Sequence, residues 1–171
     1  GSEMCIRDSY YTGVGKINAS FKTSEIIKEY SPTHIINYGT AGSLNEDLKG
    51  LVEVTRFFQR DMDATSLGFE IGQTPFDDIA EIDLGSHGFS CGTGDSFVTQ
   101  IPKLKTDLVD MEAYAIAKIC YMKNVKFRCL SGKYKSYEHP FAYVAVGKLF
   151  DHLKGPERKE QGYSTCLLYT S

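Results

Sequence analysis

The sequence predicts an α/β fold built around a parallel sheet, and three observations support this prediction. Apolar residues recur at mostly helical spacing from Lys16 to Tyr30. A short, nearly continuous apolar strand over 34–38 follows, and it runs into a small-residue segment at 39–44. A helix, a buried strand and a small-residue loop form one unit of a helix-covered parallel sheet. We therefore expect a ligand to bind where the strands end, because those loops form the crevice of an open α/β sheet.

Each further element has a signal of its own. Ser31-Pro32 ends the first helix, since the residue before a proline disfavours helical backbone. Met111, Ala115 and Ile119 mark one face of the clearest helix. Along the chain we expect a strand over 51–58, an irregular loop over 59–81, a short strand within 82–89, a small-residue turn over 91–97, a helix over 107–123, a strand over 125–130 and a terminal amphipathic helix over 139–153.

These elements form one expected domain over 10–154, because no repeat or linker divides them. The tails, 1–9 and 155–171, show no periodicity. Two interpretations stay open for them: non-native joining sequence, with Gly1-Ser2 resembling a remnant of cloning, or ordinary frayed ends.

Composition excludes several classes of protein. The 171 residues carry a net charge of −3, which argues against a general nucleic-acid binder. No apolar run approaches the ~20 residues that span a bilayer, and no signal peptide is visible. Five cysteines without any CxxC and four scattered histidines predict reduced thiols and no metal site. We expect a cytoplasmic protein with neither a membrane nor a nucleic-acid partner.

Four motifs are candidates for chemistry, and each also has a purely structural interpretation. Thr40-Ala41-Gly42-Ser43 follows a buried strand and is either an anion- or hydroxyl-binding turn or simply a tight turn. Glu112, after Met111 at the start of a helix, either accepts sugar hydroxyls or only stabilises the helix dipole. In 94–98, the ring of Phe97 either stacks on a flat base or belongs to the core.

The fourth motif is the charged and aromatic stretch 56–63. Its two arginines, Arg56 and Arg60, could bind phosphate. The simpler interpretation is a solvated ion cluster, because Asp61 and Asp63 stand beside Arg60.

Five segments in this order resemble the nucleoside phosphorylase superfamily and, within it, the methylthioadenosine/S-adenosylhomocysteine nucleosidases. The segments are GVGKINA at 13–19, INYGTAG at 36–42, RDMD with GFEIGQ at 60–63 and 68–73, GDSF at 94–97 and VDMEAYAIA at 109–117. The resemblance covers roughly residues 11–130. It implies a three-layer α/β/α fold with a mixed, largely parallel twisted sheet.

The implied reaction is hydrolysis of the N-glycosidic bond of an adenine nucleoside, which releases adenine and a thioribose. The resemblance implies no metal or organic cofactor, a homodimer, and a role in purine nucleoside metabolism and methionine salvage. It assigns the ribose hydroxyls to Glu112 and the sugar face to Met111. Phe97 would stack on adenine and the Val98 backbone would read its edge, while Thr40, Ala41 and Gly42 would line the side of the nucleophile.

Two departures from the family pattern leave the catalytic residues unassigned. An earlier strand with a glutamate that activates water has no match, because GSEMCIRDS stands there and Glu3 fits no motif. The aspartate that protonates adenine should follow a serine after the strand over 125–130, but Gly132 follows Ser131. Glu138 is the nearest carboxylate. Each missing group would cost about 10²–10⁴-fold in rate.

We therefore expect a truncated or mis-spliced copy of a nucleosidase and keep several functions open. The first is hydrolysis. The second is phosphorolysis, for which cations around phosphate are required. The third is nucleoside binding without catalysis, and the fourth is a fragment without function.

Overall fold

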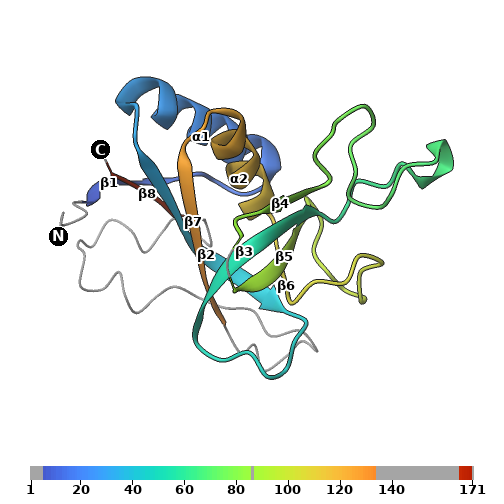
Figure 1. Ribbon diagram of the computed structural model, residues 1–171. Helices are drawn as coiled ribbons and strands as arrows, with labels where there is room; N and C mark the ends of the chain where they lie inside the picture. Colours follow the sequence, from blue (N-terminus) through green and yellow to red (C-terminus); the bar gives the residue numbers. More distant parts are fainter. Residues whose placement is uncertain (1–5, 86, 134–165, 171) are drawn as a thin grey trace.

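The structure is a computed structural model that describes residues 6–85, 87–133 and 166–170 (Figure 1). Its elements are β1 (Ile6–Tyr11), α1 (Lys16–Tyr30), β2 (His34–Ser43), β3 (Leu51–Gln59), the 3₁₀ turn η1 (Thr65–Leu67), β4 (Glu81–Asp83), β5 (Phe89–Thr93), β6 (Leu108–Asp110), α2 (Ala113–Met122), β7 (Lys126–Lys133) and β8 (Cys166–Thr170).

The strands form one mixed sheet that closes on itself. Its order is β1-β8-β2-β6-β5-β3-β4, and β7 pairs with both β2 and β3. The strands β2, β6, β5, β3 and β7 therefore complete a ring of pairings. Within it, β3, β5 and β6 are parallel neighbours, so their carboxyl ends meet at one edge. The expected mixed sheet is confirmed, although antiparallel pairings outnumber parallel ones among the described strands.

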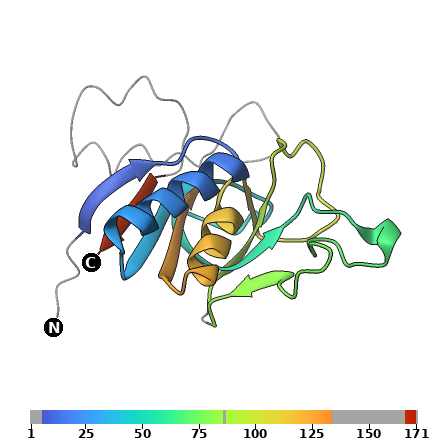
Figure 2. The same cartoon turned by 90° about the horizontal axis from the view of Figure 1, so that it is seen from above.

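Both helices lie side by side over the same face of the sheet (Figures 1 and 2). Ala19 and Ile26 of α1 pack with Ile116 and Cys120 of α2 and with Ile35 of β2. This burial of apolar area is the main source of stability for the two helices. A second cluster fills the space between α2 and the ring of strands, with Leu48, Val54, Phe57, Ile82, Leu108, Ala113 and Cys129 among its members.

The helix over 16–30 and the strand over 51–58 are confirmed, whereas the expected helix over 107–123 is wrong at its start. Leu108–Asp110 is strand β6, and the helix begins only at Ala113. The reason is tertiary: β6 pairs with both β2 and β5, and these pairings use the backbone groups that a helix would need.

The small-residue segment after the apolar core of β2 is also strand, not loop. Thr40 and Ala41 continue the parallel pairing with β7, and Gly42 lies opposite Val109 of β6. Likewise, Cys91–Thr93 belongs to β5, and the turn begins at Gly94. Pairing partners distant in sequence extend both strands beyond the limits that local pattern indicates.

Parts of both tails form strands, since β1 and β8 pair antiparallel with each other and β8 pairs with β2. The domain limits 10–154 stay a prediction. The helix expected over 139–153, together with Glu3 and Glu138, lies outside the described residues. Within the described ranges, no helix is long and apolar enough to cross a bilayer.

Candidate nucleoside-binding site

The carboxyl ends of three parallel strands bring the predicted motifs together at one edge of the sheet. Arg60 and Asp61 follow β3, the turn 94–97 follows β5, and Met111-Glu112 follows β6. The N-terminus of α1 reaches the same edge, because the backbone amides of Gly15 and Lys16 bond to Glu112 and Asp95. Strand ends and a helix N-terminus together suit an anionic or hydroxyl-rich ligand.

Glu112 lies where two helices begin. It is the N-cap residue of α2, and its Oε1 accepts a hydrogen bond of 2.9 Å from the amide of Gly15, the N-cap residue of α1. Its side chain is buried, with 6% of the residue exposed. Positive ends of helix dipoles favour a carboxylate at this position. The sequence placed Glu112 inside the first helical turn, whereas the structure places it just before the helix.

Two neighbours cap α2 in its place. The Thr93 hydroxyl donates to Asp110 Oδ1 over 2.5 Å and accepts from the Tyr114 amide over 2.8 Å. The Ala113 amide donates to Asp110 Oδ2 over 2.7 Å. Burial raises the pKa of Asp110, although these hydrogen bonds oppose the rise. Because Thr93 and Asp110 satisfy the first amides of α2, the Glu112 side chain need not cap its own helix.

The turn after β5 is held by the residues after β3. The Arg60 guanidinium donates to the carbonyls of Gly92 at 3.2 Å, Gly94 at 3.3 Å and Ser96. The Asp95 amide donates to Asp61 Oδ2 over 2.8 Å. The predicted solvated ion cluster is therefore wrong for Arg60, whose donors are directed at backbone carbonyls of the turn.

The other predicted site residues lie on neighbouring strands and loops. Ala41 is buried and Thr40 half-buried in β2, and Gly42 lies opposite Val109 of β6. Val98 is buried with 7% exposure, whereas Phe97 is 73% exposed. The exposed ring of Phe97 argues against the core interpretation of this residue and is compatible with ligand stacking.

Sequence reasoning gave no role to Thr93 and Asp110, and it considered Arg60 and Asp61 only as a phosphate site or a solvated ion cluster. Arg60, Asp61 and Thr93 act through contacts between segments 17 to 34 residues apart, which no local pattern reveals, whereas the bond of Asp110 to the Ala113 amide spans only three residues. The GDSF motif gave one usable signal, since a side chain at Gly94 would displace the end of the Arg60 side chain. A Cβ there would lie 2.8 Å from the Arg60 guanidinium carbon.

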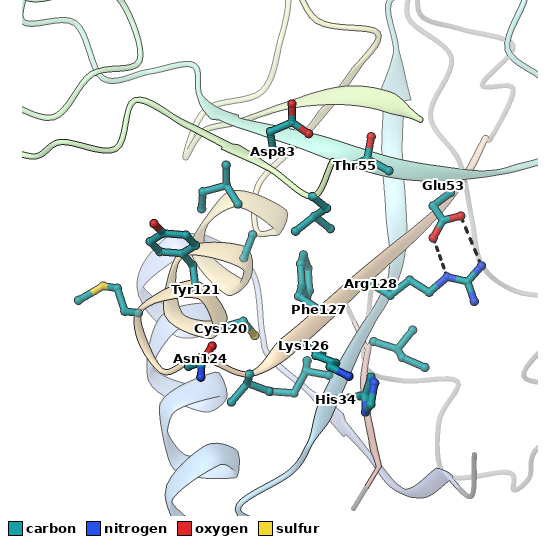
Figure 3. A pocket seen from close by; sticks show the side chains of 17 residues that line it. His34, Glu53, Thr55, Asp83, Cys120, Tyr121, Asn124, Lys126, Phe127 and Arg128 are labelled. Carbon is teal, nitrogen blue, oxygen red and sulfur yellow. Dashed lines mark hydrogen bonds and ion pairs between the residues drawn. The ribbon is translucent and has the colours of Figure 1, made fainter. Parts of the chain in front are cut away.

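A large hollow lies elsewhere, at the other end of α2 (Figure 3). It has a volume of about 900 Å³, an apolar wall that includes Phe127 and Cys120, and a rim with the ion pair Arg128–Glu53. A second hollow of about 640 Å³ lies between α1 and α2 and is lined by Lys16, Asp95 and Tyr114, among others. Neither contains a predicted site residue. We place the candidate site at Glu112 because oriented donors and a buried carboxylate gather there.

The other residues considered in the sequence analysis take part in strands or in surface ion pairs. No group of three or more His, Cys, Asp or Glu side chains within them could hold a metal ion. Ser131 and Gly132 belong to β7, and Ser131 is buried. Arg56 pairs with Glu81 at 2.5 Å and lies over the ring of Phe58.

Comparisons with known proteins show what this chain is similar to. Residues 10–86 match the sequence profile of the Phosphorylase superfamily. A 5'-methylthioadenosine/S-adenosylhomocysteine nucleosidase of Staphylococcus carnosus is 34% identical over 143 residues, covering 68% of this chain and 62% of the relative. The corresponding enzyme of Shewanella pealeana is 33% identical over 155 residues, covering 74% of this chain and 66% of the relative.

Solved structures show the same fold. A Helicobacter pylori 5'-methylthioadenosine/S-adenosylhomocysteine nucleosidase superposes with a TM-score of 0.65 at 24% identity, covering 71% of this chain and 63% of the other. The futalosine hydrolase of the same species gives a TM-score of 0.65 at 22% identity, again covering 71% and 63%.

The chain thus spans just under two thirds of the length of the curated relatives it matches. The matched segment contains α1, β2 and β3, and it ends before the strands that lead to the turn 94–97 and to Glu112. The resemblance predicted from the sequence is confirmed: residues 10–86 fall within the Phosphorylase superfamily, and the relatives of this chain are methylthioadenosine/S-adenosylhomocysteine nucleosidases.

Proposed function

We propose that this protein binds an adenine nucleoside of the methylthioadenosine or S-adenosylhomocysteine type and hydrolyses its N-glycosidic bond. The products are adenine and a thioribose. One observation supports this most strongly: the buried carboxylate of Glu112 lies at two helix N-termini and at the carboxyl ends of the parallel strands. Relatives bind matching ligands, since a Helicobacter pylori nucleosidase mutant is solved with 5'-methylthioadenosine in its active site.

Each predicted residue has a proposed role. A carboxylate accepts about four hydrogen bonds, so Glu112 can hold the Gly15 amide together with ribose hydroxyls. Met111 packs against the sugar. The exposed ring of Phe97 stacks on adenine, and the backbone of Val98 reads the edge of the base. Thr40, Ala41 and Gly42 line the side from which the nucleophile attacks.

Water is the proposed nucleophile. Phosphate would need cations with donors directed at it. The two arginines that kept phosphorolysis open are engaged elsewhere, since Arg56 pairs with Glu81 and Arg60 binds the turn after β5. This leaves hydrolysis as the favoured reaction.

The reaction passes through an oxocarbenium-like sugar and needs two proton transfers. One group must protonate the leaving adenine and another must activate water. Among the described residues, no carboxylate occupies either position of the family pattern, so these two roles stay unassigned. A second candidate function, nucleoside binding without catalysis, is favoured by this observation.

We also propose a homodimer located in the cytoplasm and acting in methionine salvage. The support for the dimer is the outer face of α1, where Ile17 is 81% exposed, Phe21 64% and the preceding Val14 49%. Apolar side chains one helical turn apart form a continuous strip, and such a strip is typical of an interface.

The deciding experiment measures adenine release from methylthioadenosine by chromatography, with and without phosphate, beside equilibrium binding of the same nucleoside. Phosphate-independent release that Glu112→Gln abolishes is the expected result. Phosphate-dependent release would establish phosphorolysis instead. Binding without release would support the second candidate function. A folded protein that neither binds nor cleaves would contradict both.

A further inference from the structure

The turn 94–97 has an unusual number of restraints from outside its own segment. Arg60 donates four hydrogen bonds to it or to its start, to the carbonyls of Gly92, Gly94 and Ser96 and to the Ser96 hydroxyl. A planar guanidinium can reach several carbonyls at once because its five N–H donors form a fixed fork. The conformation of the turn therefore depends on one side chain that follows the end of β3.

Close contact, not only hydrogen bonding, defines this arrangement. A Cβ on Gly94 would lie 2.8 Å from the Arg60 guanidinium carbon and 3.0 Å from the Asp61 carboxyl carbon. Real Cβ atoms do not approach a neighbour so closely, so a larger residue at position 94 would displace the Arg60 guanidinium from this place. The backbone of the turn rests directly on the Arg60-Asp61 pair.

The same pair connects the turn to α1. Asp61 Oδ1 forms a 2.7 Å ion pair with Lys16 Nζ, while its Oδ2 accepts the Asp95 amide. Asp95 in turn accepts the backbone amide of Lys16 over 2.8 Å, which caps α1. Gly15, the residue before, donates to Glu112. A continuous set of contacts thus runs from the turn that precedes Phe97 to the carboxylate of Glu112.

We propose that Arg60 and Asp61 are positioning residues that hold Phe97 at a defined place relative to Glu112. The spacing between the base-binding Phe97 and the sugar-binding Glu112 then fits an intact nucleoside, in which base and sugar are joined. This inference rests on the proposed function for the roles of Phe97 and Glu112. Arg60 acts only on the half of the site that binds the base, because its hydrogen bonds go to the turn that carries Phe97. Asp61 acts on both halves, because it binds the turn and Lys16. Neither residue touches the nucleoside.

The first test needs no ligand. Amide hydrogen exchange is compared in the full chain and in Arg60→Met, with Arg128→Met as the matched control. Arg128 belongs to an exposed ion pair at the other end of α2. We expect faster exchange at the Gly94 and Asp95 amides in Arg60→Met, with α2 and β7 unchanged. Unchanged exchange at these two amides would overturn the proposal.

The second test separates the two halves of the ligand. Adenine and 5-methylthioribose are titrated separately, at a temperature where all variants are folded by near-ultraviolet circular dichroism. Arg60→Met should weaken adenine binding about tenfold and leave 5-methylthioribose within about twofold. Asp61→Asn should weaken both. Equal losses for both probes in Arg60→Met would indicate a merely structural role and contradict the positioning role.

A rescue experiment adds a readout that loss of stability cannot mimic. Arg60→Ala leaves space where the guanidinium lay, and millimolar guanidinium ion should restore adenine affinity. Arg60→Lys should not restore it, because an ammonium cannot reach several carbonyls of one turn. If the unmodified chain binds neither probe, the proposed function fails, and hydrogen exchange still decides whether Arg60 holds the turn.

Discussion

The two ends of α2 differ in what surrounds them. Its N-terminus is enclosed by hydrogen bonds, which the amides of Ala113 and Tyr114 donate to Asp110 and Thr93 and the Gly15 amide donates to Glu112. Its C-terminal half faces a hollow of about 900 Å³, with Tyr121 and Met122 largely exposed (Figure 3). The N-terminal end has oriented hydrogen-bond donors and a buried carboxylate, whereas the C-terminal end has a large hollow.

This difference is why the proposed site is placed by its fixed polar groups and not by the volume of a hollow. A binding site needs polar groups fixed in place before the ligand arrives, because ordering them on binding reduces affinity. The hollow offers one exposed ion pair, Arg128–Glu53, and exposed pairs contribute little energy. The predictions below compare the two ends with matched substitutions, in decreasing order of expected effect.

The largest effect is expected from the buried face of α2. Ile116 is fully buried against α1, so Ile116→Ala should lower the free energy of unfolding by about 3 kcal/mol, through lost burial and a new cavity. Met122→Ala, at the exposed C-terminal end, should change it by less than about 0.5 kcal/mol. Urea denaturation measures both. Similar losses would mean that the two faces of α2 are wrongly assigned.

The second-largest effect is expected on the affinity for the ligand. Glu112→Gln keeps the shape and an oxygen that can accept the Gly15 amide, but removes the charge that ribose hydroxyls would bind. We expect methylthioadenosine to bind about 100-fold more weakly, as for loss of a charged hydrogen-bond partner of about 2–3 kcal/mol. Glu53→Gln, on the rim of the hollow, should bind normally. Calorimetric titration of both variants compares them, and a loss confined to Glu53→Gln would move the site to the hollow.

A smaller effect, and a gain in stability, is expected when the hydroxyl of Tyr114 is removed. Its hydroxyl is buried and has no hydrogen-bond partner among the described residues, and burial raises its pKa. Tyr114→Phe should stabilise the protein by about 1 kcal/mol, because an unsatisfied buried hydroxyl is lost. Tyr121→Phe, at 62% exposure, should have no effect on the thermal unfolding midpoint. Destabilisation by Tyr114→Phe would show that the hydroxyl does have a partner.

The smallest effect concerns pH. Burial raises the pKa of Asp61, but hydrogen bonds from Lys16 and the Asp95 amide outweigh it, so the net pKa lies below the ordinary value. A carboxylate with a depressed pKa contributes stability above its unfolded pKa, about 4, and loses it as the pH falls further. Acid should therefore destabilise the protein below about pH 4, by less than about 1 kcal/mol from this pair. Asp61→Asn should reduce that dependence, and Glu53→Gln should retain it.

Local sequence determined the elements whose contacts are close in the chain. The spacing of apolar residues predicted α1 with its observed limits, because Ser31-Pro32 and the Gly15 turn lie beside it. The same local patterns predicted β3 and a small-residue turn over 91–97, of which only the part from Gly94 onward lies outside strand β5. Ordered motifs also predicted the family, and through it the positions of Glu112 and Phe97.

Tertiary structure decided what depends on partners far along the chain. Leu108–Asp110 became a strand because β2 and β5 supply its hydrogen bonds, and Arg60 became part of the turn after β5 rather than a solvated charge. Pairing of backbone groups and directed hydrogen bonds form only after folding brings such segments together, and no periodicity in the sequence records them. For that reason the motif suggested a role for Glu112, which stays a prediction, whereas the contacts that hold its surroundings in place were decided by the tertiary structure.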